Sequence, residues 1–256
     1  MDKGYVLHSY PYRETSLILQ VWTEKHGRLG LVAKGARRPK SPSRSVLVPF
    51  QPLALDWFGR GELRTLKTAE PAVPATPLGG GSLLSAFYLN ELLLKLTTRD
   101  DPHEGLFTAY DEAIARLRAL SRASAVSGVS EPAPHAPRDI EPVLRRFELR
   151  LLQELGYAVE LAREAGAHRP IEAHLEYYYV VERGPIRAAE GDAPPNAIRL
   201  NGQTLMDLER GRFDSPTTAA QSKQLMRILI HHSLNGQELA TRSLVRDLQR
   251  IDEAAP

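Results

Sequence analysis

A run of basic residues between Lys25 and Arg44 is the clearest chemical feature of the sequence. Its seven cations are Lys25, Arg28, Lys34, Arg37, Arg38, Lys40 and Arg44, and no Asp or Glu lies among them. Clustered Lys and Arg side chains attract phosphates, because they neutralise a polyanion and release its counterions. The run therefore predicts a polyanion partner, although a solvated basic loop without a partner has the same composition.

Aromatic side chains accompany these cations. Binding of single-stranded nucleic acid needs cations that follow the phosphates and flat rings on which bases stack. Tyr12, Trp22, Trp57 and Phe58 could supply such rings, whereas packing in a hydrophobic core is the alternative for the two tryptophans. The predicted nucleic-acid-binding residues are Tyr12, Arg13, Lys25, Arg28, Lys34, Arg37, Arg38, Lys40, Arg44 and Arg60.

The distribution of charge along the chain agrees with this prediction. The 256 residues carry 33 Lys and Arg and 31 Asp and Glu, a net charge of +2. Residues 1–80 hold 12 basic and 6 acidic side chains, a net of +6, and the remainder has a net of −4. The two parts should therefore face different partners.

No pattern in the sequence predicts catalysis, a metal site or a cofactor. The absence of Cys excludes disulfides, cysteine-based zinc sites and a thiol nucleophile. His231 and His232 are adjacent, so on a helix they would point about 100° apart, which is unsuited to chelation. Helix capping explains Asp101 before Pro102. Gly79–Gly81 does not follow a strand, as a phosphate-binding loop would.

Hydropathy favours a soluble protein of the cytoplasm that has no membrane partner. The longest apolar stretch, residues 83–96, is interrupted by Asn90, Glu91 and Lys95. A helix that crosses a bilayer needs about 20 mainly apolar residues. The first residues also lack the apolar core of a signal peptide.

Five short β-prone stretches should position the cations. The expected strands cover residues 4–9, 15–23, 29–33, 53–58 and 62–69. A closed barrel buries such strands without open edges, and the five-stranded candidate is the OB-fold. Its ligand face is built by strands 2 and 3 and by loops, expected here at Ser9–Glu14 and Phe58–Gly61. These loops would carry Arg13, Arg60 and the aromatic residues Tyr10, Tyr12 and Phe58.

The rest of the chain has mainly helical patterns, so the expected fold class is α+β. Prolines and glycines near residues 71–81 predict a boundary between a barrel domain, 1–78, and a helical domain, 79–256. Helices are expected to start at Ser82, Asp101 and Asp139. The remaining expectations are a flexible linker at 121–138 and an irregular, β-containing insertion at 157–200 with a strand at Tyr177–Val181.

Several motifs, in order along the chain, resemble the RecO family of bacterial DNA repair and recombination mediators. They are Val6–Ser16, Thr23–Arg28, Val32–Pro39, Gly59–Leu63, Ala86–Leu92, Arg145–Leu149 and Leu155–Tyr157. The similarity covers most of the chain. It implies an N-terminal OB-fold followed by a helical domain.

The resemblance also implies activities and partners that composition does not show. It implies binding of single- and double-stranded DNA and annealing of complementary strands. It implies cooperation with RecR, contact with the C-terminal tail of the single-strand binding protein SSB, and help in loading RecA. A non-enzymatic protein located at the nucleoid is expected on this basis.

One departure from the family concerns zinc. Many RecO proteins carry a four-cysteine zinc module after the Leu-Gly-Tyr motif, but residues 157–199 of this chain contain no Cys. The zinc site should therefore be absent, and the β-containing region should replace its scaffold.

The SSB tail that the resemblance implies is acidic with an apolar end. It should bind a hydrophobic groove between helices that has a basic rim. The rim candidates are Arg116, Arg145, Arg146 and Arg150, although arginines on helix surfaces are often simply solvated.

Two other functions stay open. One is a protein-binding adaptor whose basic loop recognises an acidic protein in place of DNA. The other is an enzyme that acts on nucleic acid, for which the sequence offers no catalytic residues.

Overall fold

The chain folds into two compact units. The computed structural model describes residues 1–74, 76–127, 139–157, 159–188 and 193–254. The first unit, here called the barrel unit, comprises Met1–His135 and Leu239–Pro256, and the second unit comprises Ala136–Glu238. None of the described helices combines the length and the apolar character that crossing a membrane requires.

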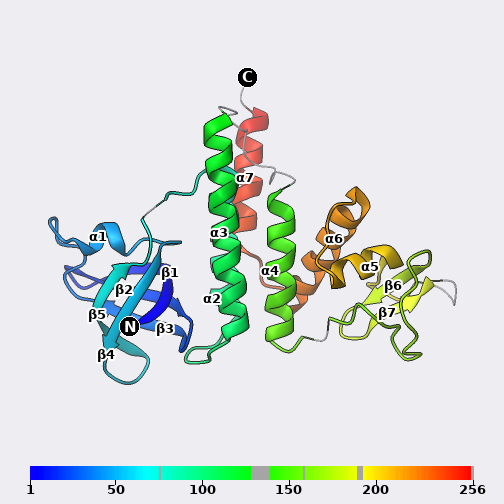
Figure 1. The fold of residues 1–256 in the computed structure, drawn as a ribbon, viewed down its shortest axis with the longest axis horizontal. Helices are drawn as coiled ribbons and strands as arrows, with labels where there is room; N and C mark the ends of the chain where they lie inside the picture. Colours follow the sequence, from blue (N-terminus) through cyan, green and yellow to red (C-terminus); the bar gives the residue numbers. More distant parts are fainter. Residues whose placement is uncertain (75, 128–138, 158, 189–192, 255–256) are drawn as a thin grey trace. The chain divides into compact units, whose positions relative to one another are not determined.

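A closed five-stranded barrel begins the barrel unit. Its strands are β1 (Asp2–Tyr12), β2 (Ser16–Thr23), β3 (Gly27–Ala33), β4 (Pro52–Phe58) and β5 (Leu63–Pro71). Their order around the barrel is β1-β2-β3-β5-β4, with β3 and β5 parallel and the other neighbours antiparallel. The predicted OB-fold barrel is confirmed (Figure 1).

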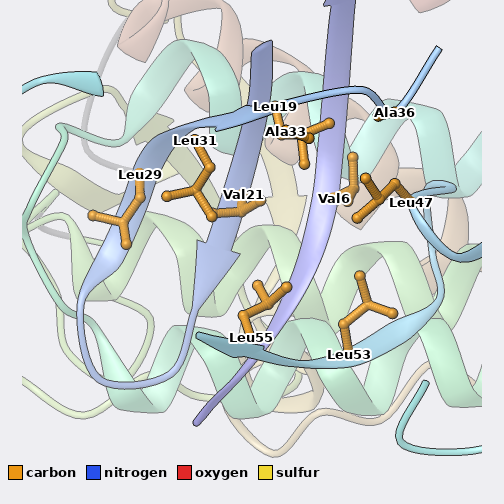
Figure 2. Packing of buried hydrophobic residues seen from close by; sticks show 10 residues of the cluster. All are labelled: Val6, Leu19, Val21, Leu29, Leu31, Ala33, Ala36, Leu47, Leu53 and Leu55. Carbon is orange, nitrogen blue, oxygen red and sulfur yellow. The ribbon is translucent and has the colours of Figure 1, made fainter. Parts of the chain in front are cut away.

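Aliphatic side chains fill the barrel interior. Successive residues of a strand point to opposite faces, so every second side chain enters the core. Figure 2 shows these side chains pointing toward one another; they include Val6, Leu19, Val21, Leu29, Leu31, Leu53 and Leu55, each at most 2% exposed. Full burial of one such side chain contributes about 1.5–3 kcal/mol, so the core alone favours closure of the barrel.

Strand β1 is longer than its sequence pattern predicts. The expected loop at Ser9–Glu14 is wrong for its first four residues, because Ser9 to Tyr12 pair with β2 in regular register. The turn is reduced to three residues, and Arg13 begins it with a φ of 50°. Pairing with β2 keeps Pro11 in the strand, although proline is usually read as a sign of a turn.

Two helices pack on the barrel, α2 (Gly80–Leu96) and α3 (Glu104–Ser127). Asn90 of α2 donates to the backbone oxygen of Leu7 in β1 at 2.9 Å. The hydroxyl of Tyr110 in α3 donates to Oδ1 of Asn90 at 2.6 Å. Asn90 and Tyr110 are buried, so these bonds fix both helices to one strand. A third helix, α7 (Ala240–Ala254), packs against α2.

Three expectations about helices need correction. The N-cap of α2 is Gly79, and Ser82 lies buried inside the helix. The helix expected at Asp101 begins at Glu104, because Thr98 and His103 hold Asp101 in the preceding loop. Residues 121–127 of the expected linker continue α3, while residues 128–138 lie outside the described residues.

The second unit combines three helices with a small sheet. The helices are α4 (Ile140–Glu154), α5 (Gly202–Glu209) and α6 (Pro216–Ser233), and the strands are β6 (Glu176–Val180), β7 (Gly184–Arg187) and β8 (Ile198–Asn201). The sheet has the order β7-β6-β8, and both strand pairs are antiparallel. The strand predicted around Tyr177 is confirmed, with Tyr177 and Tyr179 buried.

The expected division of the chain at residues 78 and 79 stays a prediction. The barrel ends at Pro71, and α2 begins at Gly80. Yet α2, α3 and α7 belong to the same compact unit as the barrel.

Candidate nucleic-acid interface

The connection between β3 and β4 closes one end of the barrel and carries cations outward. Ala36 and Leu47 of this connection lie in the barrel core, as Figure 2 shows, and the short helix α1 (Ser43–Val46) precedes Leu47. Because both apolar residues are fixed in the core, the polar chain between them faces solvent. The exposed basic residues between the two anchors are Arg37, Arg38, Lys40 and Arg44.

Arg37 ties this connection to the turn between β1 and β2. Its backbone N–H donates to the oxygen of Thr15 at 2.9 Å. Its Nη1 donates to the backbone oxygens of Arg13 at 3.2 Å and Glu14 at 3.4 Å. Gly35 has a φ of 70°, a left-handed conformation that lets the chain turn at this point. These bonds bring Arg13 beside the β3–β4 connection.

Six exposed cations therefore gather at one end of the barrel, and we call them the end cluster. They are Arg13, Lys34, Arg37, Arg38, Lys40 and Arg44. None of the six forms an ion pair within the part of the chain that the structure describes. Their charge is therefore available to phosphate groups.

Lys25 and Arg60 lie away from the end cluster. Lys25 is in the β2–β3 turn, and β2, whose eight residues span about 23 Å, separates this turn from Arg13. Arg60 is in the β4–β5 turn, beside the start of β5, where Leu63 pairs with Gly30 of β3. The structure thus brings six of the predicted cations together and leaves these two apart.

Arg28 is occupied by contacts within the barrel unit. Its guanidinium donates to the backbone oxygen of Thr97 at 2.7 Å and to the side-chain oxygen of Gln20 at 3.3 Å. Burial lowers the pKa of Arg28, and the nearby charge of Arg99 lowers it further. These contacts join β3 to the loop after α2, which sets Arg28 apart from the exposed cations.

A row of five residues crosses the outside of the barrel, and we call it the outer row. Strand pairing aligns one residue from each strand, in the order Tyr10, Ile18, Val32, Thr65 and Phe58. The neighbours of Ile18 and Val32 in their strands enter the core, so these two point outward. Tyr10 is 47% and Phe58 56% exposed, whereas the three residues between them are half-buried.

The aromatic residues differ in their placement. Trp22 is buried, and Trp57 packs partly against the barrel core, so core packing holds for both tryptophans. Tyr12 is half-buried, with the Arg13 guanidinium 5.1 Å from its ring centre. Tyr10 and Phe58 are the exposed Tyr and Phe rings of the barrel strands. Both belong to the loops expected from the sequence to bind a ligand, and Phe58 is also one of the rings considered for base stacking, but neither is among the predicted nucleic-acid-binding residues. The signal available in the sequence was their position beside turn cations.

The four candidates for an SSB-tail rim are not equivalent. Arg116 is exposed on α3 of the barrel unit, and the other three lie on α4 of the second unit. Arg145 is buried and pairs with Glu148 at 2.6 Å, so it does not form an exposed rim. Arg146 donates to the backbone oxygen of Gly211 at 3.0 Å, and Arg150 pairs with Glu154 at 2.5 Å.

The described residues show no candidate metal site. Within them, no group of three or more His, Cys, Asp or Glu side chains is placed to hold a metal ion. His232 pairs with Glu182 at 3.0 Å and not with His231.

Comparisons with known proteins find the same family along nearly the whole chain. The family model described as "Recombination protein O N terminal" matches residues 1–74, and "Recombination protein O C terminal" matches residues 134–242. A protein of Azoarcus sp. (strain BH72) named DNA repair protein RecO is 49% identical over 98% of this chain and 96% of its own length. Proteins of the same name from Nitrosospira multiformis and Ralstonia nicotianae are 46% and 47% identical over 97% of this chain, and over 95% and 84% of their own lengths.

Proposed function

Because the chain belongs to the RecO family of DNA repair and recombination proteins, we propose that it binds single- and double-stranded DNA through the end cluster. The observation that carries this proposal is the gathering of six exposed cations, without ion pairs to described residues, at one end of an OB-fold barrel. Contacts to phosphates carry no sequence information, so the same surface suits both forms of DNA.

Annealing of complementary strands follows from the same electrostatics. Two strands repel each other through their phosphates, and cations that neutralise part of this charge allow them to approach. No covalent bond is made or broken in this step, so the protein acts without a catalytic site.

A charge reversal that spares the Arg37 contacts tests this proposal. Lys34→Glu/Arg38→Glu removes two cations of the end cluster and leaves the bonds from Arg37 to the β1–β2 turn in place. We expect at least tenfold weaker binding of both single- and double-stranded DNA in low salt, and slower annealing. The measurement is fluorescence anisotropy of labelled oligonucleotides.

Arg183→Glu/Arg227→Glu is the matched control, because it changes the net charge equally at two exposed positions of the second unit. Its DNA affinity should stay within about twofold of the wild type, since unspecific effects of net charge are screened. Equal losses in both double variants would count against a localised DNA surface. If an acidic protein binds the end cluster while DNA does not, the adaptor function replaces this proposal.

Protein partners complete the proposed role. We propose that the chain works with RecR, contacts the SSB tail and thereby helps RecA to load at the nucleoid. Arg146 and Arg150 are the exposed rim candidates on α4. A pull-down with SSB-tail peptides tests the tail contact. The protein should retain the complete peptide and should not retain a peptide that lacks the last apolar residue. Equal retention of the two peptides would contradict binding in a hydrophobic groove.

A further inference from the structure

Three exposed apolar side chains gather where the end of the β3–β4 connection meets α2. Val48 is 37%, Val73 is 44% and Phe87 is 40% exposed, and clustered apolar groups that stay in water indicate an interaction site. Phe50, two residues after Val48, packs its ring edge-on against that of Phe87, with 4.9 Å between the ring centres. The side-chain amide of Gln51 donates to the backbone oxygen of Val73 at 2.6 Å. We call Val48, Phe50, Val73 and Phe87 the apolar patch.

The backbone at Phe50 is held in a conformation that bulky residues rarely adopt. Its φ is 66°, and among the described residues it is the only one with an apolar side chain and a positive φ. This left-handed conformation is strained for a side chain of that size. Arg118 of α3 fixes it, because its Nη2 donates to the backbone oxygen of Phe50 at 2.7 Å. The fold thus maintains a strained residue beneath the exposed ring of Phe87, and such strain is typical of functional sites.

Basic side chains border the apolar patch. Arg118 lies half-buried against it, and Arg122, one turn further along α3, is exposed and donates to the hydroxyl of Thr76 at 2.6 Å. Arg44 of α1 lies four residues before Val48. None of these three arginines forms an ion pair with a residue that the structure describes. The patch therefore has a positive rim.

Acidic side chains offset little of this charge. Glu70 is exposed at the end of β5, three residues before Val73. Residues 71–90, which supply Val73 and Phe87, contain no charged residue. An apolar centre with aromatic side chains and arginines is the typical composition of a protein interface, and the positive rim requires negative charge on the partner.

Two other occupants suit the apolar patch less well. DNA presents charged phosphates, which an apolar centre would strip of water without giving them a hydrogen-bond partner. A second copy of the chain, docked patch to patch, would bring two positive rims together, and these would repel each other. An acidic protein avoids both costs, because it offers apolar side chains for the centre and carboxylates for the rim.

We propose that the apolar patch docks an acidic protein, which places an apolar side chain on Phe87 and Val48 and carboxylates opposite Arg118 and Arg122. This inference goes beyond the DNA binding proposed above and does not rest on it. Arg44 borders the patch and also belongs to the end cluster, so the docked protein lies beside the surface proposed for DNA.

The first step of the test identifies the occupant in living cells. The photoreactive residue benzoylphenylalanine replaces Phe87 in the full chain, and in a control chain it replaces Tyr157, a ring of the second unit that is 37% exposed. After irradiation, the adducts are identified by mass spectrometry. We expect position 87 to cross-link a protein of net negative charge that position 157 does not cross-link.

The second step measures the affinity of this cross-linked protein, purified, for variants of the chain by calorimetry. Val48→Ser/Phe87→Ser should bind it at least tenfold more weakly, because aromatic side chains at the centre of an interface contribute most of the affinity. Arg122→Glu, a change at an exposed position, should weaken binding at least fivefold and reduce its dependence on salt. Tyr157→Ser should bind like the wild type. All variants should keep the wild-type affinity for DNA.

Several results would overturn the inference. Position 87 could give no protein adduct, or an adduct only with DNA or with a second copy of the chain. The purified protein could bind Val48→Ser/Phe87→Ser or Arg122→Glu as tightly as the wild type. A loss of DNA affinity in Val48→Ser/Phe87→Ser would assign the patch to the DNA surface in place of a protein partner.

Discussion

Glu164 is a buried carboxylate that organises its part of the second unit. Its side chain is 2% exposed and accepts hydrogen bonds from Nε of Arg169 at 2.6 Å and from Nε of Arg187 at 2.9 Å. Burial alone would raise the pKa of Glu164, but the bonds from Arg187 and Arg169 outweigh it and leave the pKa below its usual value. A buried charge needs such partners, because an unpaired one is costly.

Replacing this carboxylate should make the second unit less stable and less sensitive to acid. The pKa of Glu164 is lower in the folded state than in the unfolded state. The ionised carboxylate therefore stabilises the fold fully above the usual glutamate pKa, and this stabilisation is lost as the pH falls toward and through the lowered pKa. We expect Glu164→Gln to destabilise the unit by about 2 kcal/mol at pH 7 and by less at pH 4. Hydrogen exchange of β6 and β7 at the two pH values measures this.

The control is Glu176→Gln, since Glu176 pairs with Arg199 at an exposed position. An exposed ion pair contributes about 0–1 kcal/mol, so this variant should exchange nearly like the wild type. If hydrogen exchange of β6 and β7 at pH 7 were the same in Glu164→Gln and the wild type, the Glu164 carboxylate would not stabilise this part of the second unit.

Asn90 provides a second prediction at the scale of one residue. It is 2% exposed and bonds both the backbone of β1 and the hydroxyl of Tyr110. Asn90→Leu keeps the branched shape and the number of side-chain heavy atoms but leaves Leu7 O and the tyrosine hydroxyl without this partner, so we expect a loss of about 2–3 kcal/mol. Tyr110→Phe, which removes one of the two bonds, should cost about 1 kcal/mol.

Urea unfolding followed by tryptophan fluorescence measures these losses in the barrel unit alone. The two tryptophans of the chain, Trp22 and Trp57, both belong to the barrel. Equal midpoints for Asn90→Leu and the wild type would show that the hydrogen bonds of Asn90 do not contribute to holding the helices on the barrel.

At the scale of elements, α7 depends on a side chain from another helix. The carboxylate of Glu91 in α2 accepts from the N–H of Ala240 at 2.7 Å and from the N–H of Thr241 at 2.9 Å. These N–H groups belong to the first turn of α7, which has no partners for them within the helix. Burial tends to raise the pKa of Glu91, but the bonds from Thr241 and Ala240 leave it lowered.

Removal of this cap should loosen α7 selectively. Glu91→Ala should cost about 1 kcal/mol, the usual value of a lost N-cap, and raise hydrogen exchange within residues 240–247. Lys95→Ala removes a residue whose Nζ is 3.6 Å from the Glu91 carboxylate and should have a smaller effect. Unchanged exchange in Glu91→Ala would mean that the helix is held by other contacts.

Local patterns predict the strands of the barrel. They do not predict how far each strand extends or which turns lie at the same end of the barrel. The period of two in Leu53, Leu55 and Trp57 is sufficient to predict a strand. The extension of β1 to Tyr12 is not predictable in this way, because it depends on pairing with β2. The separation of Lys25 from Arg13 likewise follows only from the direction of β2, which places the two turns at opposite ends of the strand.

Long-range contacts also decide which candidate residues stay available. Arg37 lies beside Arg13 through bonds between residues 24 apart in the chain, and Arg28 is occupied by Thr97, which lies 69 residues away. No local property of the sequence distinguishes these two arginines. Composition therefore predicts a polyanion partner. The fold decides which cations make contacts within the protein and which stay exposed to bind that partner.

At the scale of the whole molecule, charge is distributed unevenly along the chain. The first 80 residues carry a net charge of +6 and include the barrel, while the rest carries −4. The second unit, Ala136–Glu238, lies in the sequence between α3 and α7 of the barrel unit. We expect DNA to bind the basic barrel and the protein partners to bind elsewhere.

The most direct test of DNA binding by the end cluster is the salt dependence of single-strand affinity. If all six cations engage phosphates, the plot of log K against log salt concentration should have a slope of up to about −4, from roughly 0.7 per phosphate. The Lys34→Glu/Arg38→Glu variant should lower the magnitude of this slope by at least about 1.4. A wild-type slope near zero, or the same slope in both proteins, would contradict the account.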